Sequence, residues 1–198
     1  MRYDPDRHHR RSIRLKGFDY SSVGAYFVTV CVQGRMGLFG ELVDGEMHLS
    51  PAGEMVSRVW AQIPRRFPGW QTDVFVVMPN HVHGVLAASG DHKDRPYSES
   101  DPRRDEPRVR PDHPEGTTAG SLGRVVQAFK SLTTVKYARG VKGSGWPPFD
   151  KRLWQRNYYE RILRDEDKLQ VVREYIVHSP LAWHTDEENP NAHPAPAL

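Results

Sequence analysis

The sequence of 198 residues contains a single cysteine, Cys31, which excludes a disulfide within the chain. So low a cysteine content is typical of proteins from the reducing cytoplasm. No stretch approaches the roughly 20 apolar residues that a membrane-spanning helix needs. The basic N-terminus is not followed by the apolar run of a signal peptide. These absences predict a cytoplasmic protein without a membrane segment.

Acidic residues are nearly absent between residues 121 and 157, where Asp150 is the only one. The beginning of the chain is also mainly basic, and the isoelectric point calculated from the sequence is about 9.0. A charged run is most often a solvated helix face. Here the shortage of acids favours a polyanionic partner such as a nucleic acid. The basic residues of the segment are Arg124, Lys130, Lys136, Arg139, Lys142, Lys151, Arg152 and Arg156.

Three segments are rich in β-branched and aromatic residues, which is typical of buried strands. They comprise residues 26–32, 74–78 and 81–88. Residues 39–49 contain the turn pair Asp44-Gly45 and are expected to form a hairpin. The position of a fourth strand stays open between residues 149–154 and one arm of this hairpin.

Three helices are expected from their start and stop signals. Ser50 followed by Pro51 is typical of a helix N-terminus, and apolar residues continue at helical spacing as far as Ile63. A second helix begins at Ser121 and is expected to end near residues 139–140. A third helix begins at Asp165 and ends before Pro180.

This order of elements predicts an α+β protein, a ferredoxin-like sandwich with an antiparallel sheet and helices packed on one face. We expect one domain over residues 20–183, preceded by a basic arm (residues 1–19) and followed by a polar tail (residues 184–198). Residues 89–120 are rich in proline and charged side chains. Because so little apolar surface is available there to offset chain entropy, we expect a mobile insertion within the domain.

A pair of histidines follows the second predicted strand. His81 and His83 begin a strand, in which residues i and i+2 point to the same face, so both imidazoles converge. Two neutral imidazoles bind a divalent cation and leave other coordination positions open for a substrate. Zinc is disfavoured, because no cysteine or third histidine nearby completes a tetrahedral set. The pair alone fits either a metal site or two histidines that alternate on a strand by chance.

Tyr175 lies on the flank of the last predicted helix, with its hydroxyl free to reach outward. The pattern fits either an amphipathic residue that anchors the helix or a nucleophile for a phosphodiester bond. Tyr158 and Tyr159 are the alternative nucleophiles. Their position among basic residues is more typical of packing or of base stacking.

Four blocks of the sequence resemble the REP-associated tyrosine transposases, relatives of the smallest insertion-sequence transposases. Residues 77–85 are similar to the HUH motif (His, bulky hydrophobe, His) of this family, and residues 121–131 resemble its first conserved helix. Residues 154–166 and 175–180 resemble its C-terminal block. The likeness covers about residues 20–183, except for the insertion.

The resemblance implies a ferredoxin-like domain of the HUH endonuclease type that uses Mg²⁺ or Mn²⁺. It implies that His81 and His83 bind the metal and that Tyr175 is the nucleophile. In the family pattern, an Asn or Gln four residues after the tyrosine completes the metal shell, and this chain has Ser179 there. The third ligand is therefore Ser179, a water or the neighbouring His178.

The function implied by this resemblance is a metal-dependent transposase that nicks and rejoins hairpin-containing single-stranded DNA through a 5′-phosphotyrosine. Repetitive extragenic palindromes are the expected partner, and Arg124, Lys130 and Arg156 are the expected phosphate contacts. One alternative is a non-cleaving protein that binds structured single-stranded DNA or RNA. Another is hydrolysis by a metal-bound water. Both a monomer and a homodimer are compatible with the sequence.

Overall fold

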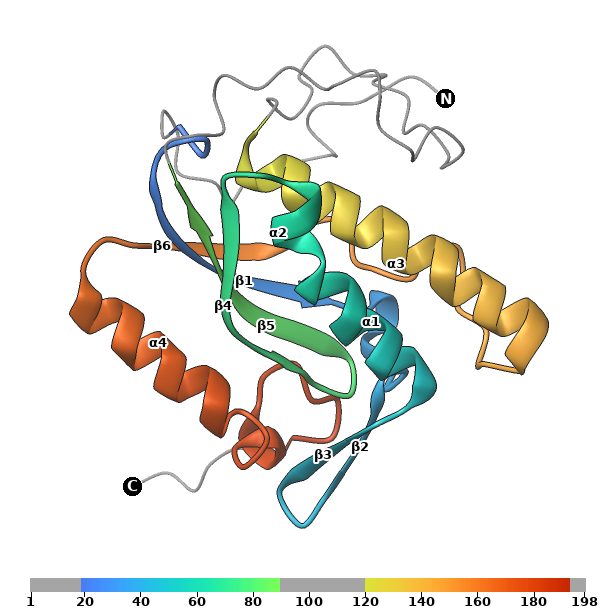
Figure 1. The fold of residues 1–198 in the computed structure, drawn as a ribbon. Helices are drawn as coiled ribbons and strands as arrows, with labels where there is room; N and C mark the ends of the chain where they lie inside the picture. Colours follow the sequence, from blue (N-terminus) through green and yellow to red (C-terminus); the bar gives the residue numbers. More distant parts are fainter. Residues whose placement is uncertain (1–18, 90–119, 193–198) are drawn as a thin grey trace, which may run out of the picture.

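The computed structural model describes residues 19–89 and 120–192 (Figure 1). The predicted arm (residues 1–19) and the predicted insertion (residues 89–120) fall almost entirely outside the described residues. Within the described part, no helix is long and apolar enough to cross a bilayer.

A four-stranded antiparallel sheet forms the centre of the fold, in the order β4-β5-β1-β6. Strand β1 (Gly24–Cys31) is central and pairs with β5 (His81–Ala88) on one side and with β6 (Tyr159–Leu163) on the other. Strand β4 (Trp70–Val77) forms one edge. The three predicted strands are therefore present, and β6 is the fourth strand. Neither location considered for it, residues 149–154 or an arm of the hairpin, is correct.

The expected hairpin is present as β2 (Gly40–Val43) and β3 (Glu46–Leu49), joined at Asp44-Gly45. Both turn residues have positive φ, which matches the turn that a two-residue hairpin prefers. The hairpin forms a sheet of its own and does not extend the central sheet.

Helix α1 (Pro51–Ala61) begins as expected, because the Ser50 side chain accepts a hydrogen bond from the Gly53 amide. A short helix, α2 (Ile63–Arg66), follows. The Trp60 ring of α1 lies against β5 at Gly84, where an added Cβ would be 2.4 Å from a ring carbon. Gly84, the residue after the histidine pair, therefore allows α1 to pack closely on the sheet.

Helix α3 (Leu122–Ser144) is longer than the sequence predicts. Gly140 lies within the helix and does not end it, and the missing side chain at this position leaves room for the Trp146 ring. The helix ends at Gly145, whose left-handed conformation (φ +68°) is typical of a helix C-terminus. Helix α4 (Glu166–His178) begins at the predicted cap, where the Asp165 carboxylate accepts from the Lys168 amide.

The sheet separates two hydrophobic clusters, because alternate residues of β1 point to opposite faces. Tyr26, Val28, Val30 and Val32 join the larger cluster, together with side chains of α1 and α3. Phe27 joins the smaller cluster, whose members include residues of α4. The α+β class and the antiparallel sheet with helices packed on one face are confirmed, and α4 covers the opposite face.

Candidate active site

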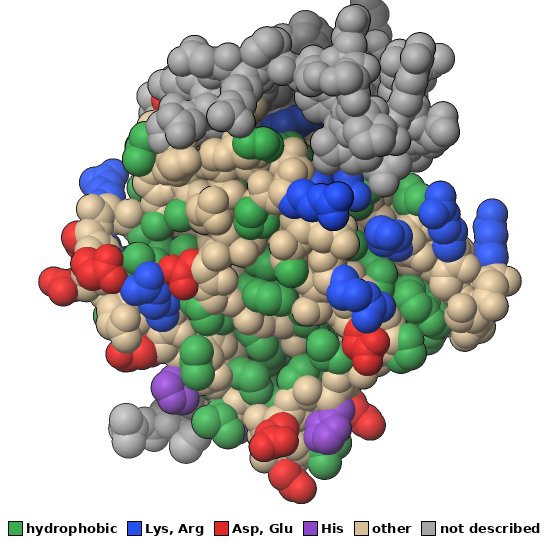
Figure 2. Space-filling view, viewed as in Figure 1, with side chains coloured by type: hydrophobic (Ala, Val, Ile, Leu, Met, Phe, Trp, Pro, Cys, Tyr) green, Lys and Arg blue, Asp and Glu red, His purple; other side chains and the backbone are tan. Residues whose placement is uncertain are grey.

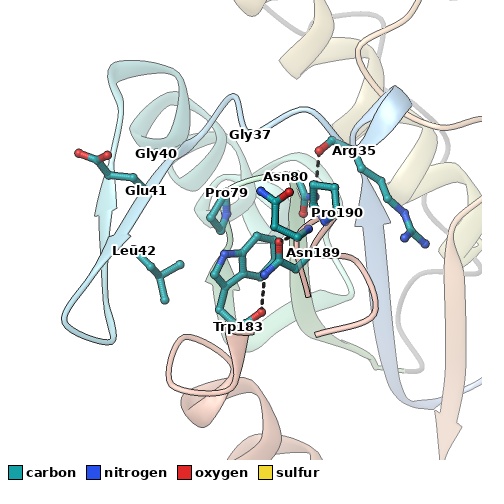
Figure 3. A pocket seen from close by; sticks show the side chains of 11 residues that line it. Arg35, Gly37, Gly40, Glu41, Leu42, Pro79, Asn80, Trp183, Asn189 and Pro190 are labelled. Carbon is teal, nitrogen blue, oxygen red and sulfur yellow. Dashed lines mark hydrogen bonds between the residues drawn. The ribbon is translucent and has the colours of Figure 1, made fainter. Parts of the chain in front are cut away.

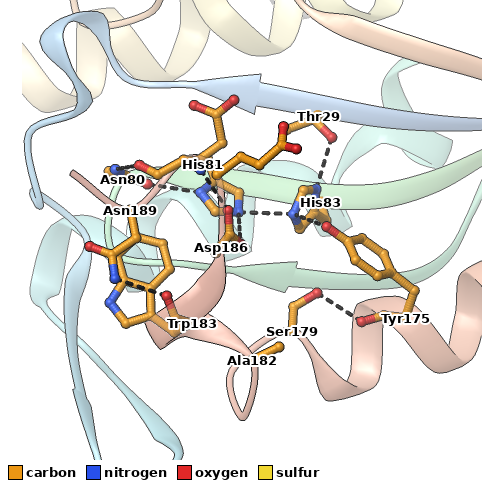
Figure 4. Close-up of polar contacts among 12 residues, drawn as sticks. Thr29, Asn80, His81, His83, Tyr175, Ser179, Ala182, Trp183, Asp186 and Asn189 are labelled. Carbon is orange, nitrogen blue, oxygen red and sulfur yellow. Dashed lines mark hydrogen bonds and ion pairs between the residues drawn. The ribbon is translucent and has the colours of Figure 1, made fainter. Parts of the chain in front are cut away.

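His81 and His83 converge at the start of β5, on the face that α4 covers (Figure 4). The intervening Val82 points into the larger cluster, as the period of a strand requires. The two Nε2 atoms lie 2.9 Å apart, and both side chains are buried. The structure therefore has the convergence that the sequence predicts for this pair.

Hydrogen bonds to the Nδ1 atoms fix the orientation of the two imidazoles. The Asn80 amide nitrogen donates to the carbonyls of Arg35 and Glu188, so its oxygen faces Nδ1 of His81 at 2.8 Å. His81 must donate through Nδ1, which leaves a lone pair on Nε2. Nδ1 of His83 lies 2.8 Å from the Thr29 hydroxyl, which can donate or accept. The Nε2 atoms of both rings are thus directed into the site.

Burial keeps both histidines neutral. Burial lowers the pKa of His83 to about 4. Burial also lowers the pKa of His81 well below its ordinary value, and the nearby His83 and Arg35 lower it further. A neutral imidazole is the form that binds a metal ion.

Asp186 adds a carboxylate to the pair. Its Oδ2 lies 3.8 Å from Nε2 of His81, and one ligand atom from each of the three residues lies within 4.8 Å of the others. Two imidazoles and one carboxylate form a recognised set of ligands for divalent transition metals. The sequence analysis missed Asp186, because it lies in the segment assigned to the polar tail.

The segment that carries Asp186 folds back over the histidine pair. The 3-10 helix η3 (Trp183–Thr185) precedes it, and the Trp183 ring centroid lies 5.9 Å from that of His81. The Asp186 carboxylate also accepts from the Glu188 amide, and Glu188 pairs with Arg35. This part of the predicted tail therefore packs against the domain.

A pocket of about 240 Å³ lies between this segment and the hairpin, with Asn80 in its lining (Figure 3). Residues from three separate parts of the sequence line it, including Arg35, Asn80, Trp183 and Asn189. Asn189 donates through its side chain to the Trp183 carbonyl. The pocket is thus a product of the folded C-terminal segment.

Tyr175 projects from α4 toward the histidine pair (Figure 4). Its hydroxyl oxygen lies 3.3 Å from Nε2 of His83, and its ring packs edge-on against Phe27. Tyr175 is 48% exposed. Burial raises the pKa of Tyr175, and the acidic residues of the C-terminal segment raise it further. The neutral phenol is therefore the resting form.

Ser179 lies one helical turn after Tyr175 and is buried. Its hydroxyl donates to the Tyr175 carbonyl at 2.8 Å. Nδ1 of the alternative ligand, His178, lies 2.7 Å from the Glu174 carbonyl. The oxygen that lies beside His81 belongs to Asp186, and the role of Ser179 as a metal ligand stays a prediction.

The predicted phosphate contacts lie on α3 and in the loop before β6. The Lys130 ammonium donates to the carbonyls of Gln155, Arg156 and Asn157, and burial lowers its pKa to about 8. Through these hydrogen bonds Lys130 holds the loop before β6, and its role as a phosphate contact stays a prediction. Arg156 is exposed, and Arg124 lies 3.4 Å from Gln127. Figure 2 shows Lys and Arg side chains gathered over α2 and α3, and acidic side chains over the start of α4.

Together these features define a ferredoxin-like α+β protein in which two buried histidines and a partly buried aspartate lie beside a half-exposed tyrosine. The chain belongs to the same family as a Haemophilus influenzae protein described only as an uncharacterized protein. The two are 38% identical over 186 residues, which cover 94% of this chain and 96% of that protein. No protein-family model matches the chain.

Two solved structures are similar in fold. The REP-associated tyrosine transposase, determined bound to a REP hairpin, aligns with a TM-score of 0.53 and 16% identity over 86% of this chain and 74% of that one. A putative transposase from Deinococcus radiodurans aligns with a TM-score of 0.44 and 15% identity over 84% of this chain and 96% of that one. At such identity, the first likeness shows a shared fold.

Proposed function

We propose that this protein is a metal-dependent transposase that cuts and rejoins single-stranded DNA, with Tyr175 as the nucleophile. The observation that carries the proposal is the distance of 3.3 Å between the Tyr175 hydroxyl and Nε2 of His83. A tyrosine from α4, two histidines from β5 and a carboxylate from the C-terminal segment converge although they lie far apart in sequence. Their chemistry is that required for nucleophilic attack on a phosphodiester beside a cation.

His81, His83 and Asp186 fit a divalent metal ion. Both Nε2 atoms face the site, because Asn80 and Thr29 engage the opposite ring nitrogens. The Thr29 hydroxyl suits the tautomer of His83 that leaves Nε2 unprotonated. Mg²⁺ and Mn²⁺ are the candidates, and the two nitrogen ligands favour Mn²⁺. Such an ion polarises a phosphodiester and stabilises the negative charge that develops during attack.

The reaction conserves the phosphodiester bond energy. The phenol oxygen of Tyr175 forms a bond with phosphorus, and the bond from phosphorus to the 3′-oxygen breaks. The phenol proton is carried finally by the free 3′-hydroxyl, and the 5′-phosphate remains on the tyrosine. Attack of a 3′-hydroxyl on this ester reverses the step, so the strand is rejoined without ATP.

A hairpin in single-stranded DNA is the proposed substrate. The REP-associated transposase that shares the fold was determined bound to a REP hairpin, which supports this choice. The basic segment between residues 121 and 157 supports a polyanionic partner, with Arg124 and Arg156 as its proposed phosphate contacts.

The proposal is tested with a hairpin oligonucleotide labelled at its 3′ end, incubated with Mn²⁺ or Mg²⁺ and separated on a denaturing gel. We expect a covalent protein–DNA adduct that is lost in Tyr175→Phe, in the double variant His81→Ala/His83→Ala, and in EDTA. Tyr158→Phe and Tyr159→Phe are the matched controls and retain the adduct.

The other outcomes contradict the proposal in distinct ways. Cleavage without an adduct indicates hydrolysis by a metal-bound water, and a mobility shift without cleavage indicates a binding protein. An adduct that survives Tyr175→Phe but is lost in Tyr158→Phe or Tyr159→Phe assigns the nucleophile to another tyrosine.

A further inference from the structure

A second tyrosine lies on the same face of the sheet as the histidine pair. Thr29 of β1 is in register with His83 of β5 on one side and with Tyr159 of β6 on the other. Residues directly opposite each other in antiparallel strands point to the same face. Tyr159 therefore lies in one row with Thr29 and His83, at the edge of the sheet.

The Phe27 ring connects Tyr159 to the proposed active site. It stacks on His83 at a centroid distance of 5.4 Å and meets Tyr175 edge-on at 5.9 Å. Its third contact is Tyr159, at 6.2 Å and 68°. Tyr159 thus reaches His83 only through the buried Phe27 ring, whereas Tyr175 contacts His83 directly.

The beginning of β6 is left open by α4. Leu163, at the end of the strand, is 5% exposed beneath the helix, whereas Tyr159 at its start is 52% exposed. Tyr159 and Tyr175 are the aromatic residues among the exposed large hydrophobic side chains of the described chain. About half of Tyr159 thus stays exposed beyond its contact with Phe27, which leaves part of this side chain available to a ligand.

Arg161 supplies a positive charge beside this ring. It is in register with Phe27, so its side chain is on the same face of the sheet as Tyr159. Arg161 is exposed, and no residue of the described chain forms an ion pair with it. An exposed aromatic ring next to an unpaired guanidinium is the combination that binds a nucleobase and its phosphate.

We propose that Tyr159 and Arg161 form a nucleotide subsite for single-stranded DNA. Tyr159 stacks on the base that flanks the reacting phosphate, and Arg161 contacts the next phosphate. The position of this base beside the reacting phosphate rests on the proposed role of Tyr175, whereas the stacking itself does not. Because stacking uses the ring and not the hydroxyl, the subsite depends on an aromatic residue at position 159.

The test measures binding without catalysis. Fluorescein-labelled dT12 is titrated with protein in EDTA and followed by fluorescence anisotropy, beside a 12-residue abasic oligonucleotide with the same phosphates. We expect Tyr159→Ala to weaken dT12 binding by about tenfold, the usual effect of losing one stacked base. Tyr159→Phe and Tyr159→Trp stay within about twofold of the wild type. The abasic oligonucleotide binds weakly to all of these proteins.

Arg161→Ala is expected to weaken the binding of both oligonucleotides to a similar degree. The effect of this substitution should be smaller at high salt. Two matched controls remove similar side chains elsewhere. Val23→Ala removes an exposed apolar side chain before β1, and Arg65→Ala removes an exposed charge from α2, which packs on the opposite face. Both controls bind dT12 as the wild type does.

The proposed subsite is contradicted if Tyr159→Ala binds dT12 as tightly as the wild type. It is also contradicted if Tyr159→Phe loses as much dT12 affinity as Tyr159→Ala. The subsite is also overturned if the wild type prefers dT12 no more than the abasic oligonucleotide. Failure of the proposed function is distinguishable from these results. If the wild type forms no tyrosine adduct but Tyr159→Ala still weakens dT12 binding, the subsite is supported and the proposed strand transfer is contradicted.

Discussion

At the scale of single residues, the chemistry depends on how each ring nitrogen is used. His81 and His83 direct Nε2 into the site only because Asn80 and Thr29 engage their other nitrogens. The third partner, Asp186, is held by a hydrogen bond from the Glu188 amide. The three candidate metal ligands are thus each oriented by a separate neighbour, which is the usual arrangement around a metal in a protein.

The Asp186 carboxylate is expected to contribute directly to metal affinity. Asp186→Ala should weaken Mn²⁺ binding at least about tenfold, because it removes the one charged ligand. The measurement is calorimetric titration with Mn²⁺, supported by the rise in melting temperature that a bound ion produces. Glu187→Ala is the matched control, since it removes the same charge from an exposed neighbour.

Ser179→Ala discriminates between the two candidates for the third ligand. The Ser179 hydroxyl donates to a helix carbonyl, so its loss should leave Mn²⁺ affinity nearly unchanged. If Ser179→Ala weakens Mn²⁺ binding and Asp186→Ala does not, the serine is the ligand and our assignment is wrong.

The histidine pair was predictable from sequence and its carboxylate partner was not. The spacing of His81 and His83 fixes their common face once a strand is recognised. Asp186 stands in a polar, proline-rich context, and it reaches His81 only through the tertiary fold of the C-terminal segment. No local pattern encodes such a contact.

At the scale of elements, α4 is tied to the sheet by an ion-pair cluster close to Tyr175. The Arg173 guanidinium donates to Asp73 of β4 through Nε and Nη2, at 3.1 and 2.7 Å from Oδ2. Nη1 donates to Glu166. Asp73 lies where the register between β4 and β5 is irregular. The guanidinium holds the pKa of Asp73 below its usual value, so the carboxylate is charged at neutral pH.

We expect the Arg173–Asp73 pair to position Tyr175 two residues further along α4. Arg173→Lys and Asp73→Asn remove the forked contact, and a shift of the tyrosine by about 1 Å can cost up to about 10²-fold in rate. The rate of adduct formation in a single turnover should therefore fall at least about tenfold, while the affinity for the hairpin oligonucleotide stays unchanged.

The charge-reversed double variant Asp73→Arg/Arg173→Asp should recover part of the lost rate. Lys168→Met is the control, because it breaks an exposed ion pair at the start of α4 that does not reach the sheet. A loss of affinity without a loss of rate would show that the pair supports DNA binding and does not position the tyrosine.

Elements with a strong local sequence signal were predictable, whereas strand β6, which lacks such a signal, was not. The hairpin turn at Asp44-Gly45 and the caps at Ser50 and Asp165 lie where the sequence places them. Strand β6 has charged residues at Glu160 and Arg161 and lies at the sheet edge, so it lacks the apolar run of the other strands. Its pairing with β1 comes from the fold as a whole.

At the scale of the whole molecule, the larger hydrophobic cluster and the proposed active site lie on opposite faces of the sheet. The larger cluster joins α1 and α3 to one face, and the smaller cluster joins α4 to the face that carries the histidines. The smaller cluster has few buried members, among them Val172 and Ile176 of α4. Helix α4 is therefore expected to open locally before the domain unfolds.

Two matched core substitutions test this division. Leu86→Ala in the larger cluster should destabilise the whole domain by about 2–5 kcal/mol, lower the melting temperature and speed exchange of the slowest amides in β1 and β5. Ile176→Ala removes an equally buried side chain from the smaller cluster. It should speed amide exchange mainly in α4 and reduce adduct formation, because it loosens the helix that carries Tyr175. If hydrogen-exchange mass spectrometry instead shows equal loss of protection in α4 and β5 for Ile176→Ala, the helix unfolds with the domain as one cooperative unit.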